Sequence, residues 1–174
     1  MAWDVLRSIG APVALAVAAC VGCGRSEASG STGKAGGHTP AAGAGSCGHA
    51  ACGDNFFVDT LPDQACMAGE SCTVNVKLVA LGDYHVNDEY PYRFKADEID
   101  GIQFMGTDAA GKNIFSKPAG NWRKTDEKGG VMAVNFFPST PGTHTISGTF
   151  KLSVCSAANC LLEQRPVTAS LVAH

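Results

Sequence analysis

The sequence predicts an all-β domain, an antiparallel immunoglobulin-like β-sandwich of about seven strands. Apolar side chains in the C-terminal part of the chain alternate with polar ones at a period of two. Turn-forming Gly, Pro, Asp and Lys residues separate the alternating segments. No segment carries the periodicity of an amphipathic helix, so strands are the elements that the pattern favours.

The strands are predicted from this alternation. In chain order they are Asn55–Asp59, Thr73–Leu81, Tyr92–Ala96, Ile102–Met105, Val131–Phe137, His144–Val154 and Val167–Ala173. The pattern is clearest in His144–Val154, where apolar residues from Ile146 onward alternate with polar ones. From Asn55 to His174 the chain has about 120 residues, enough to bury roughly two-thirds of its unfolded surface in a core of its own.

Composition excludes several classes of protein. The chain has 174 residues, of which 45% are hydrophobic and 17% charged, which excludes a wholly disordered chain and a multi-span membrane protein. The formal net charge is −3 and there is no basic stripe, so we expect no nucleic-acid partner. No catalytic triad, phosphate loop or dinucleotide fingerprint is visible. Eight cysteines are many for a reducing cytosol and indicate export.

Residues 1–19 predict a secretory signal peptide. Arg7 supplies an early positive charge, and the apolar run Ile9–Ala19 has about eleven residues, too few to span a bilayer as a helix. The run ends in Val17-Ala18-Ala19-Cys20, which resembles the lipobox of bacterial lipoproteins. The resemblance implies lipidation of Cys20, with the lipid anchoring the protein to a membrane of the cell envelope, facing the periplasm or the exterior.

Two alternatives to lipidation at Cys20 stay open. Cys23 is the other candidate acceptor, because its use would leave an even number of cysteines, whereas the use of Cys20 leaves one unpaired. However, Cys20 would then occupy the lipobox position that usually holds Leu or Val. The second alternative is an ordinary secreted protein that is cut near Ala19. We favour Cys20.

Residues 20–54 predict a flexible linker, and residues 55–174 the β-sandwich. The linker is rich in Gly, Ala and Ser and lacks large apolar side chains that would offset its ordering entropy. It contains Cys47-Gly48-His49-Ala50-Ala51-Cys52, which predicts a small disulfide loop. The spacing matches neither a zinc ribbon nor a c-type haem motif, so we expect no metal there and no other cofactor.

Two further cysteine pairs lie in the domain. Cys66 and Cys72 precede a strand and predict a local disulfide, although the sequence leaves cross-pairing, such as Cys66 with Cys155, open. Cys155 ends a strand, and four residues separate it from Cys160, which fits two cysteines bridging the neck of a hairpin. Closing so short a loop contributes about 2 kcal/mol, against about 4.7 kcal/mol for a loop of about a hundred residues. An accessible local pair is well placed for exchange with another protein's thiol.

Two stretches resemble the N-terminal periplasmic domain of transmembrane thiol:disulfide interchange proteins of the DsbD type. They are Gly82–Phe94, similar to that domain's Gly-Tyr-Tyr-Leu-Tyr segment, and Leu152–Cys160, where the family carries its redox pair. The resemblance implies that Cys155 and Cys160 are the redox pair and that a thioredoxin-like or other exported protein is the partner. The spacer between the cysteines is one residue shorter than in the family, and Leu161–Gln164 replaces its Pro-rich turn.

We therefore expect an exported, lipid-anchored β-sandwich that takes part in thiol–disulfide exchange through Cys155 and Cys160. The alternative is a non-catalytic binding or structural lipoprotein whose disulfides only stabilise the fold. We interpret His85 and His144 as structural residues rather than as ligands.

Overall fold

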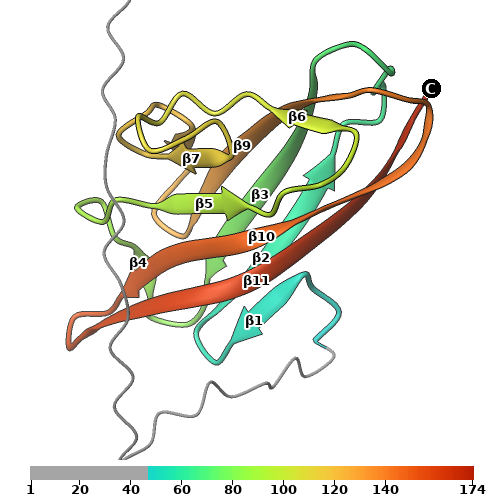
Figure 1. Cartoon of the computed structure of the whole chain (residues 1–174). Coiled ribbons are helices and arrows are strands. Elements are labelled where there is room, and N and C mark those ends of the chain that lie inside the picture. Colours follow the sequence, from blue (N-terminus) through green and yellow to red (C-terminus); the bar gives the residue numbers. More distant parts are fainter. Residues whose placement is uncertain (1–46) are drawn as a thin grey trace, which may run out of the picture. The chain divides into compact units, whose positions relative to one another are not determined.

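The computed structural model describes residues 47–174, which form eleven strands and no helix (Figure 1). The strands make two antiparallel sheets, which confirms the predicted fold class. The first sheet has the order β1 (Ala51–Gly53), β2 (Phe56–Pro62), β3 (Cys72–Ala80), β9 (Gly129–Pro138) and β6 (Ile102–Phe104), with β8 (Trp122–Lys124) also paired to β9. The second has the order β11 (Cys160–Ala173), β10 (Gly142–Cys155), β5 (Arg93–Ala96) and β7 (Ile114–Ser116), with β4 (His85–Val86) also paired to β10.

Every segment with a predicted strand pattern contains a strand, namely β2, β3, β5, β6, β9, β10 and β11. The other strands, β1, β4, β7 and β8, have two or three residues each. A strand of two or three residues is too short for alternation to show in the sequence.

The predicted signal peptide and both candidate lipid acceptors, Cys20 and Cys23, lie outside the described residues. Across residues 47–174, we find no helical segment with the length and hydropathy needed to cross a bilayer.

The folded part begins before Asn55. The predicted linker, residues 20–54, is therefore too long at its C-terminal end. Ala51–Gly53 pair with β2, and a disulfide joins Cys47 to Cys52. The His49 ring stacks on Phe57 at 4.0 Å, and its Nδ1 lies 2.7 Å from a carboxylate oxygen of Asp59. The composition does not reveal this strand, because its small residues give no apolar pattern. The pairing is made by backbone groups.

The core lies between the two sheets. Side chains on β3 alternate between buried and half-buried along the whole strand, and β9 continues the pattern. Each large apolar side chain that is buried in this way stabilises the fold by about 1.5–3 kcal/mol. The largest fully buried side chains are Tyr92, Phe56, Phe94, Phe115, Phe136, Phe150, Leu78, Met132, Ile146 and Leu152.

A glycine on β9 allows the core aromatic cluster to form. Gly130 lies beneath the Trp122 ring, and any Cβ at this position would overlap that ring. The ring therefore lies close to β9 and stacks on Tyr92, with centroids 4.0 Å apart and an interplanar angle of 13°. Tyr90 packs edge-on against Tyr92 at 5.2 Å.

Tyr92 also ties the segment after β4 to β10. Its hydroxyl donates to the Ser153 carbonyl at 2.7 Å and accepts from the Asn87 backbone N–H at 2.8 Å. The Asn87 side-chain amide donates to the Ser153 hydroxyl at 3.3 Å. Burial raises the pKa of the Tyr92 phenol, which therefore stays a neutral donor. These bonds fix the chain that runs beside the end of β10.

We predict that Tyr92→Phe lowers the free energy of unfolding by about 1–3 kcal/mol, because it removes two short hydrogen bonds and leaves the Asn87 N–H and the Ser153 carbonyl only their longer bond to each other at 3.4 Å. Tyr90→Phe is the matched control, since among residues 47–174 the Tyr90 hydroxyl makes no hydrogen bond. Urea unfolding measures both variants. Equal stabilities of Tyr92→Phe and wild type would contradict the role given to this hydroxyl.

Candidate functional site at the tip of the C-terminal hairpin

The C-terminal hairpin carries the candidate site at its tip. Its strands β10 and β11 pair from Gly142 with Ala173 to Cys155 with Cys160, and the tip lies at the end away from the C-terminus (Figure 1). Ser156 closes the turn. Its backbone N–H donates to the Asn159 carbonyl at 2.8 Å, and its hydroxyl oxygen accepts from the Ala158 and Asn159 N–H groups at 3.2 and 3.3 Å.

Residues 47–174 contain three disulfides, each within one of the local pairs described from the sequence. Cys155 is bonded to Cys160 with their Cα atoms 4.0 Å apart, and Cys66 to Cys72 with 5.2 Å. The third bond joins Cys47 and Cys52. The cross-pairing that the sequence left open is therefore not formed.

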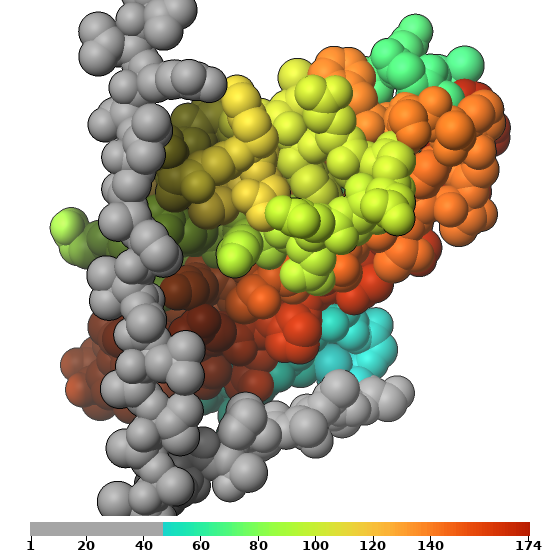
Figure 2. Space-filling model, viewed as in Figure 1, coloured from blue at the N-terminus to red at the C-terminus, as the bar shows by residue number. Residues whose placement is uncertain are grey.

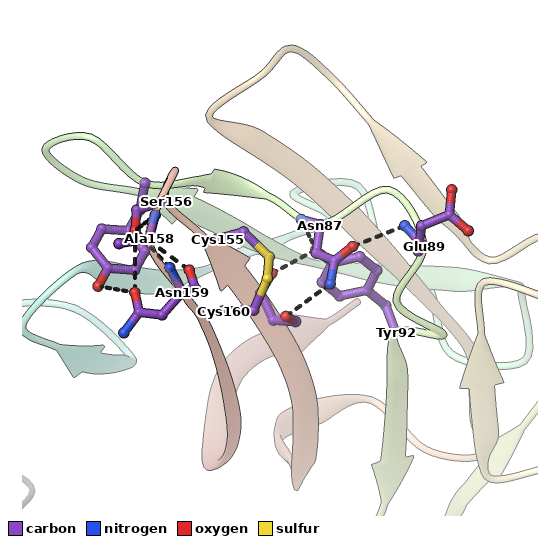
Figure 3. The surroundings of a disulfide bond; sticks show 10 residues. Asn87, Glu89, Tyr92, Cys155, Ser156, Ala158, Asn159 and Cys160 are labelled. Atoms are coloured by element: carbon purple, nitrogen blue, oxygen red, sulfur yellow. Dashed lines mark hydrogen bonds between the residues drawn. A yellow bond between two sulfur atoms is a disulfide. The ribbon is translucent and has the colours of Figure 1, made fainter.

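Cys155 and Cys160 differ in exposure although they lie side by side. Val154 and Leu152, which alternate with Cys155 on the strand, are fully buried in the core, so the two sulfurs lie on the outer face of the sheet. Cys155 is only 6% exposed, whereas Cys160 is exposed. Figure 3 shows the bond between the turn at the hairpin tip and the segment that contains Asn87 and Glu89.

The two sides of the disulfide are also unequal. Strand β4 pairs with β10 opposite to β11, and this register places His85 opposite Cys155. On the other side β11 is the outermost strand of its sheet, so no strand of residues 47–174 pairs beyond Cys160. Cys155 is thus enclosed between two strands, while Cys160 lies at the sheet edge.

Several polar contacts hold β4 and its flanking loops in place. The Val86 N–H donates to the Glu127 carbonyl at 2.9 Å, and the Lys128 ammonium donates to the Gly82 and Tyr84 carbonyls at 2.7 Å each. The Tyr84 hydroxyl donates to the Asn159 side-chain oxygen at 3.0 Å, which joins this region to the hairpin turn.

An ion pair fixes the loop after β4. Lys124 binds the Asp88 carboxylate at 2.7 Å, and Lys117 donates to the Asp88 carbonyl. The hydrogen bond from Lys124 is the main reason why the pKa of the Asp88 carboxyl lies below its usual value.

The other two disulfides have different surroundings. Cys66 is 1% exposed and Cys72 is fully buried, so that bond lies in the core. Cys47 is exposed and Cys52 half-buried, beside the His49–Asp59 pair. Among residues 47–174, no group of three or more His, Cys, Asp or Glu side chains is arranged to hold a metal ion.

The sequence marks Cys155 and Cys160 as candidates, but it does not show which residues surround them. Strand register places His85 opposite Cys155, and nothing in the sequence indicates that these two residues are neighbours. Ser156 and Asn159 are residue types that favour turns, and they lie between two cysteines. This position is the feature of the sequence that indicates a closed turn. A hollow lined by Ile102, Phe137 and Pro138 lies on the other sheet and includes no cysteine.

Comparison with known proteins assigns the chain to no family. Neither a protein-family model nor a curated protein sequence matches the chain. Among solved structures the chain is similar to AggA, the major subunit of the aggregative adherence fimbriae type I of Escherichia coli. The identity is 11% and the TM-score 0.33, over 72% of this chain and 100% of that chain. The sandwich assignment therefore rests on the strand pairing of the protein itself.

We predict a fixed order of reduction under native conditions. A small thiol should reduce Cys155–Cys160 and Cys47–Cys52 well before Cys66–Cys72, because only the last pair is closed to solvent at both cysteines. Acid quenching, alkylation and peptide mass mapping give the reduction rate of each bond. Reduction of Cys66–Cys72 as fast as the other two would contradict the burial described here.

Proposed function

We propose that this protein is an exported, lipid-anchored β-sandwich that exchanges its Cys155–Cys160 disulfide with a dithiol protein partner. The observation that carries the proposal is the position of Cys160. It is exposed, lies on the outermost strand of its sheet, and is bonded to a buried cysteine on the neighbouring strand. This combination offers one sulfur to a partner and shields the other from solvent on the same face of the sheet.

The Cys155–Cys160 disulfide contributes little to the stability of the fold, which supports a role in exchange. A disulfide stabilises a protein most when it closes a long loop. Cys155 and Cys160 are five positions apart, at the end of two strands of 14 residues each that are paired throughout. The backbone ladder holds this hairpin together, so the bond adds only about 2 kcal/mol.

The surroundings of the bond select the sulfur that reacts. A thiolate attacks a disulfide along the sulfur–sulfur axis and expels the far sulfur. Attack on Cys160 comes from beyond the sheet edge, where none of the described strands pairs, whereas attack on Cys155 would come from the side that β4 occupies. The mixed disulfide with the partner therefore forms at Cys160, and Cys155 leaves as the thiolate.

The second step completes a two-electron transfer. The partner's other thiolate attacks the partner sulfur of the mixed disulfide and releases Cys160 as a thiolate. The partner is oxidised to its disulfide and the Cys155–Cys160 pair is reduced to two thiols. The same steps in reverse pass electrons from the reduced pair to an oxidised partner.

The sequence features outside the described residues give the proposal its location. The lipobox-like segment that ends at Cys20 would hold the domain on a membrane of the cell envelope, with Cys23 as the alternative acceptor. The likeness of Leu152–Cys160 to the redox segment of DsbD-type periplasmic domains supports exchange with a thioredoxin-like protein.

A trapping experiment tests the proposed exchange. The probe is a reduced thioredoxin-type protein in which the resolving cysteine is replaced by Ser, so that a mixed disulfide cannot be released. With the folded, oxidised protein we expect an adduct whose mass map joins the probe to Cys160 and leaves Cys155 as a free thiol.

Two double variants control the trapping. Cys155→Ser with Cys160→Ser should stay folded, lose about 2 kcal/mol of unfolding free energy and form no adduct at this site. Cys47→Ser with Cys52→Ser should keep the adduct at Cys160. If the adduct formed only in denaturant, or if the first double variant failed to fold, the pair would be a structural staple and the binding or structural lipoprotein would be the better description.

A further inference from the structure

We infer that His85 is the proton donor of this exchange, the side chain that protonates the Cys155 sulfur as it leaves and deprotonates it when the disulfide re-forms. The inference rests on the exchange proposed above and adds a residue that acts in it. The observation that carries it is a row of three residues across neighbouring strands: His85 on β4, Cys155 on β10 and Cys160 on β11.

Strand register places these side chains on one face. Residues directly opposite each other on antiparallel strands point to the same side, with Cβ atoms about 4.5–5.5 Å apart. His85 is exposed, and the next residue, Val86, is 1% exposed and faces the core. The imidazole therefore lies on the outer face with the two sulfurs, at the end of the row opposite to the sheet edge.

This end of the row is where negative charge develops. Attack from the sheet edge on Cys160 makes Cys155 the leaving sulfur, and Cys155 is only 6% exposed. Water solvates a thiolate poorly in such surroundings, which slows its departure unless a proton or a positive charge is close. His85 is the neighbour in register that is able to supply either one.

The step balances as follows. The electron pair of the partner thiolate forms the new bond to the Cys160 sulfur, and the Cys155–Cys160 bond breaks. Its electron pair goes to the Cys155 sulfur, which takes the proton of the His85 imidazolium. In the reverse direction the neutral imidazole removes that proton, and the Cys155 thiolate attacks Cys160 and expels the partner thiolate.

Charged groups surround β4. One of them is the Asp88 carboxylate, whose pKa is lowered mainly by the hydrogen bond from Lys124. Charged groups on the elements that flank β4 are Asp83, Asp88, Glu89, Lys117, Lys124, Asp126, Glu127 and Lys128.

The experiment measures reduction of the folded full chain by dithiothreitol between pH 5.5 and 8.5, with peptide mass mapping of each disulfide. The rate at Cys155–Cys160 is divided by the thiolate fraction of the reductant. We expect this corrected rate to fall about tenfold or more as pH rises, because histidine loses its proton in this range.

Two substitutions separate charge from structure. His85→Gln should give the low rate at every pH, because it has no proton to donate. His85→Lys should give the high rate at every pH, because an ammonium stays charged throughout the range. His144→Gln is the matched control: His144 lies near the other end of β10, where its Nε2 is 2.8 Å from the Thr140 carbonyl oxygen, and its loss should leave the profile unchanged.

The outcomes distinguish this inference from the exchange itself. If His85→Gln kept the wild-type rate and pH profile, or if Gln and Lys slowed the reaction equally, His85 would not be the proton donor, while the exchange at Cys160 would stand. If the folded wild type resisted dithiothreitol at Cys155–Cys160 at every pH, the proposed exchange itself would fail. The Cys47–Cys52 rate in the same samples should not respond to either substitution.

Discussion

The register between β10 and β11 is the constraint on which both the fold and the candidate site depend. A shift by one residue would turn Val167, Ala169 and Leu171 away from the core and bring Cys160 opposite a residue other than Cys155. The hydrophobic alternation of two long strands therefore does two things at once. It closes one side of the sandwich, and it sets the two cysteines directly opposite each other on the outer face.

The neighbours of this hairpin make its two sides different. On the β10 side of the hairpin, Tyr92 and Asn87 bind Ser153, two residues before Cys155. These bonds hold the chain that contains β4 against β10. On the other side of the hairpin, β11 is a long edge strand, and other chains tend to pair with strands of this kind. Pro166 lies within β11 and lacks an N–H donor, which weakens such pairing while Cys160 stays accessible.

The length of each strand decides whether the sequence predicts it. Strands such as β3 and β10 were predictable because they are long enough for alternation to show. β4 has two residues, and its pairing with β10 joins parts of the chain about 70 positions apart, so neither its existence nor the place of His85 was visible. The start of the folded part was missed for a similar reason, since β1 consists of small residues that pair through their backbone.

Of the candidate site, the sequence supplied the two cysteines and their position around a short turn, but not which of them is buried. That difference arises from tertiary packing: β4 lies beside Cys155, whereas in the described part of the chain no strand pairs on the side of Cys160. Because cysteine reactivity follows accessibility, this asymmetry is the feature that changes a local disulfide from a candidate staple into a candidate exchange site.

The reduction potential of Cys155–Cys160 tests the central claim most directly. The protein is equilibrated in redox buffers of stepped potential, and the oxidised fraction of each disulfide is mapped by mass. The account predicts that Cys155–Cys160 titrates above about −300 mV, in the range of exchange-active disulfides, and that the buried Cys66–Cys72 bond lies below it. A Cys155–Cys160 potential as low as that of Cys66–Cys72 would contradict the account and leave a disulfide that only stabilises the hairpin.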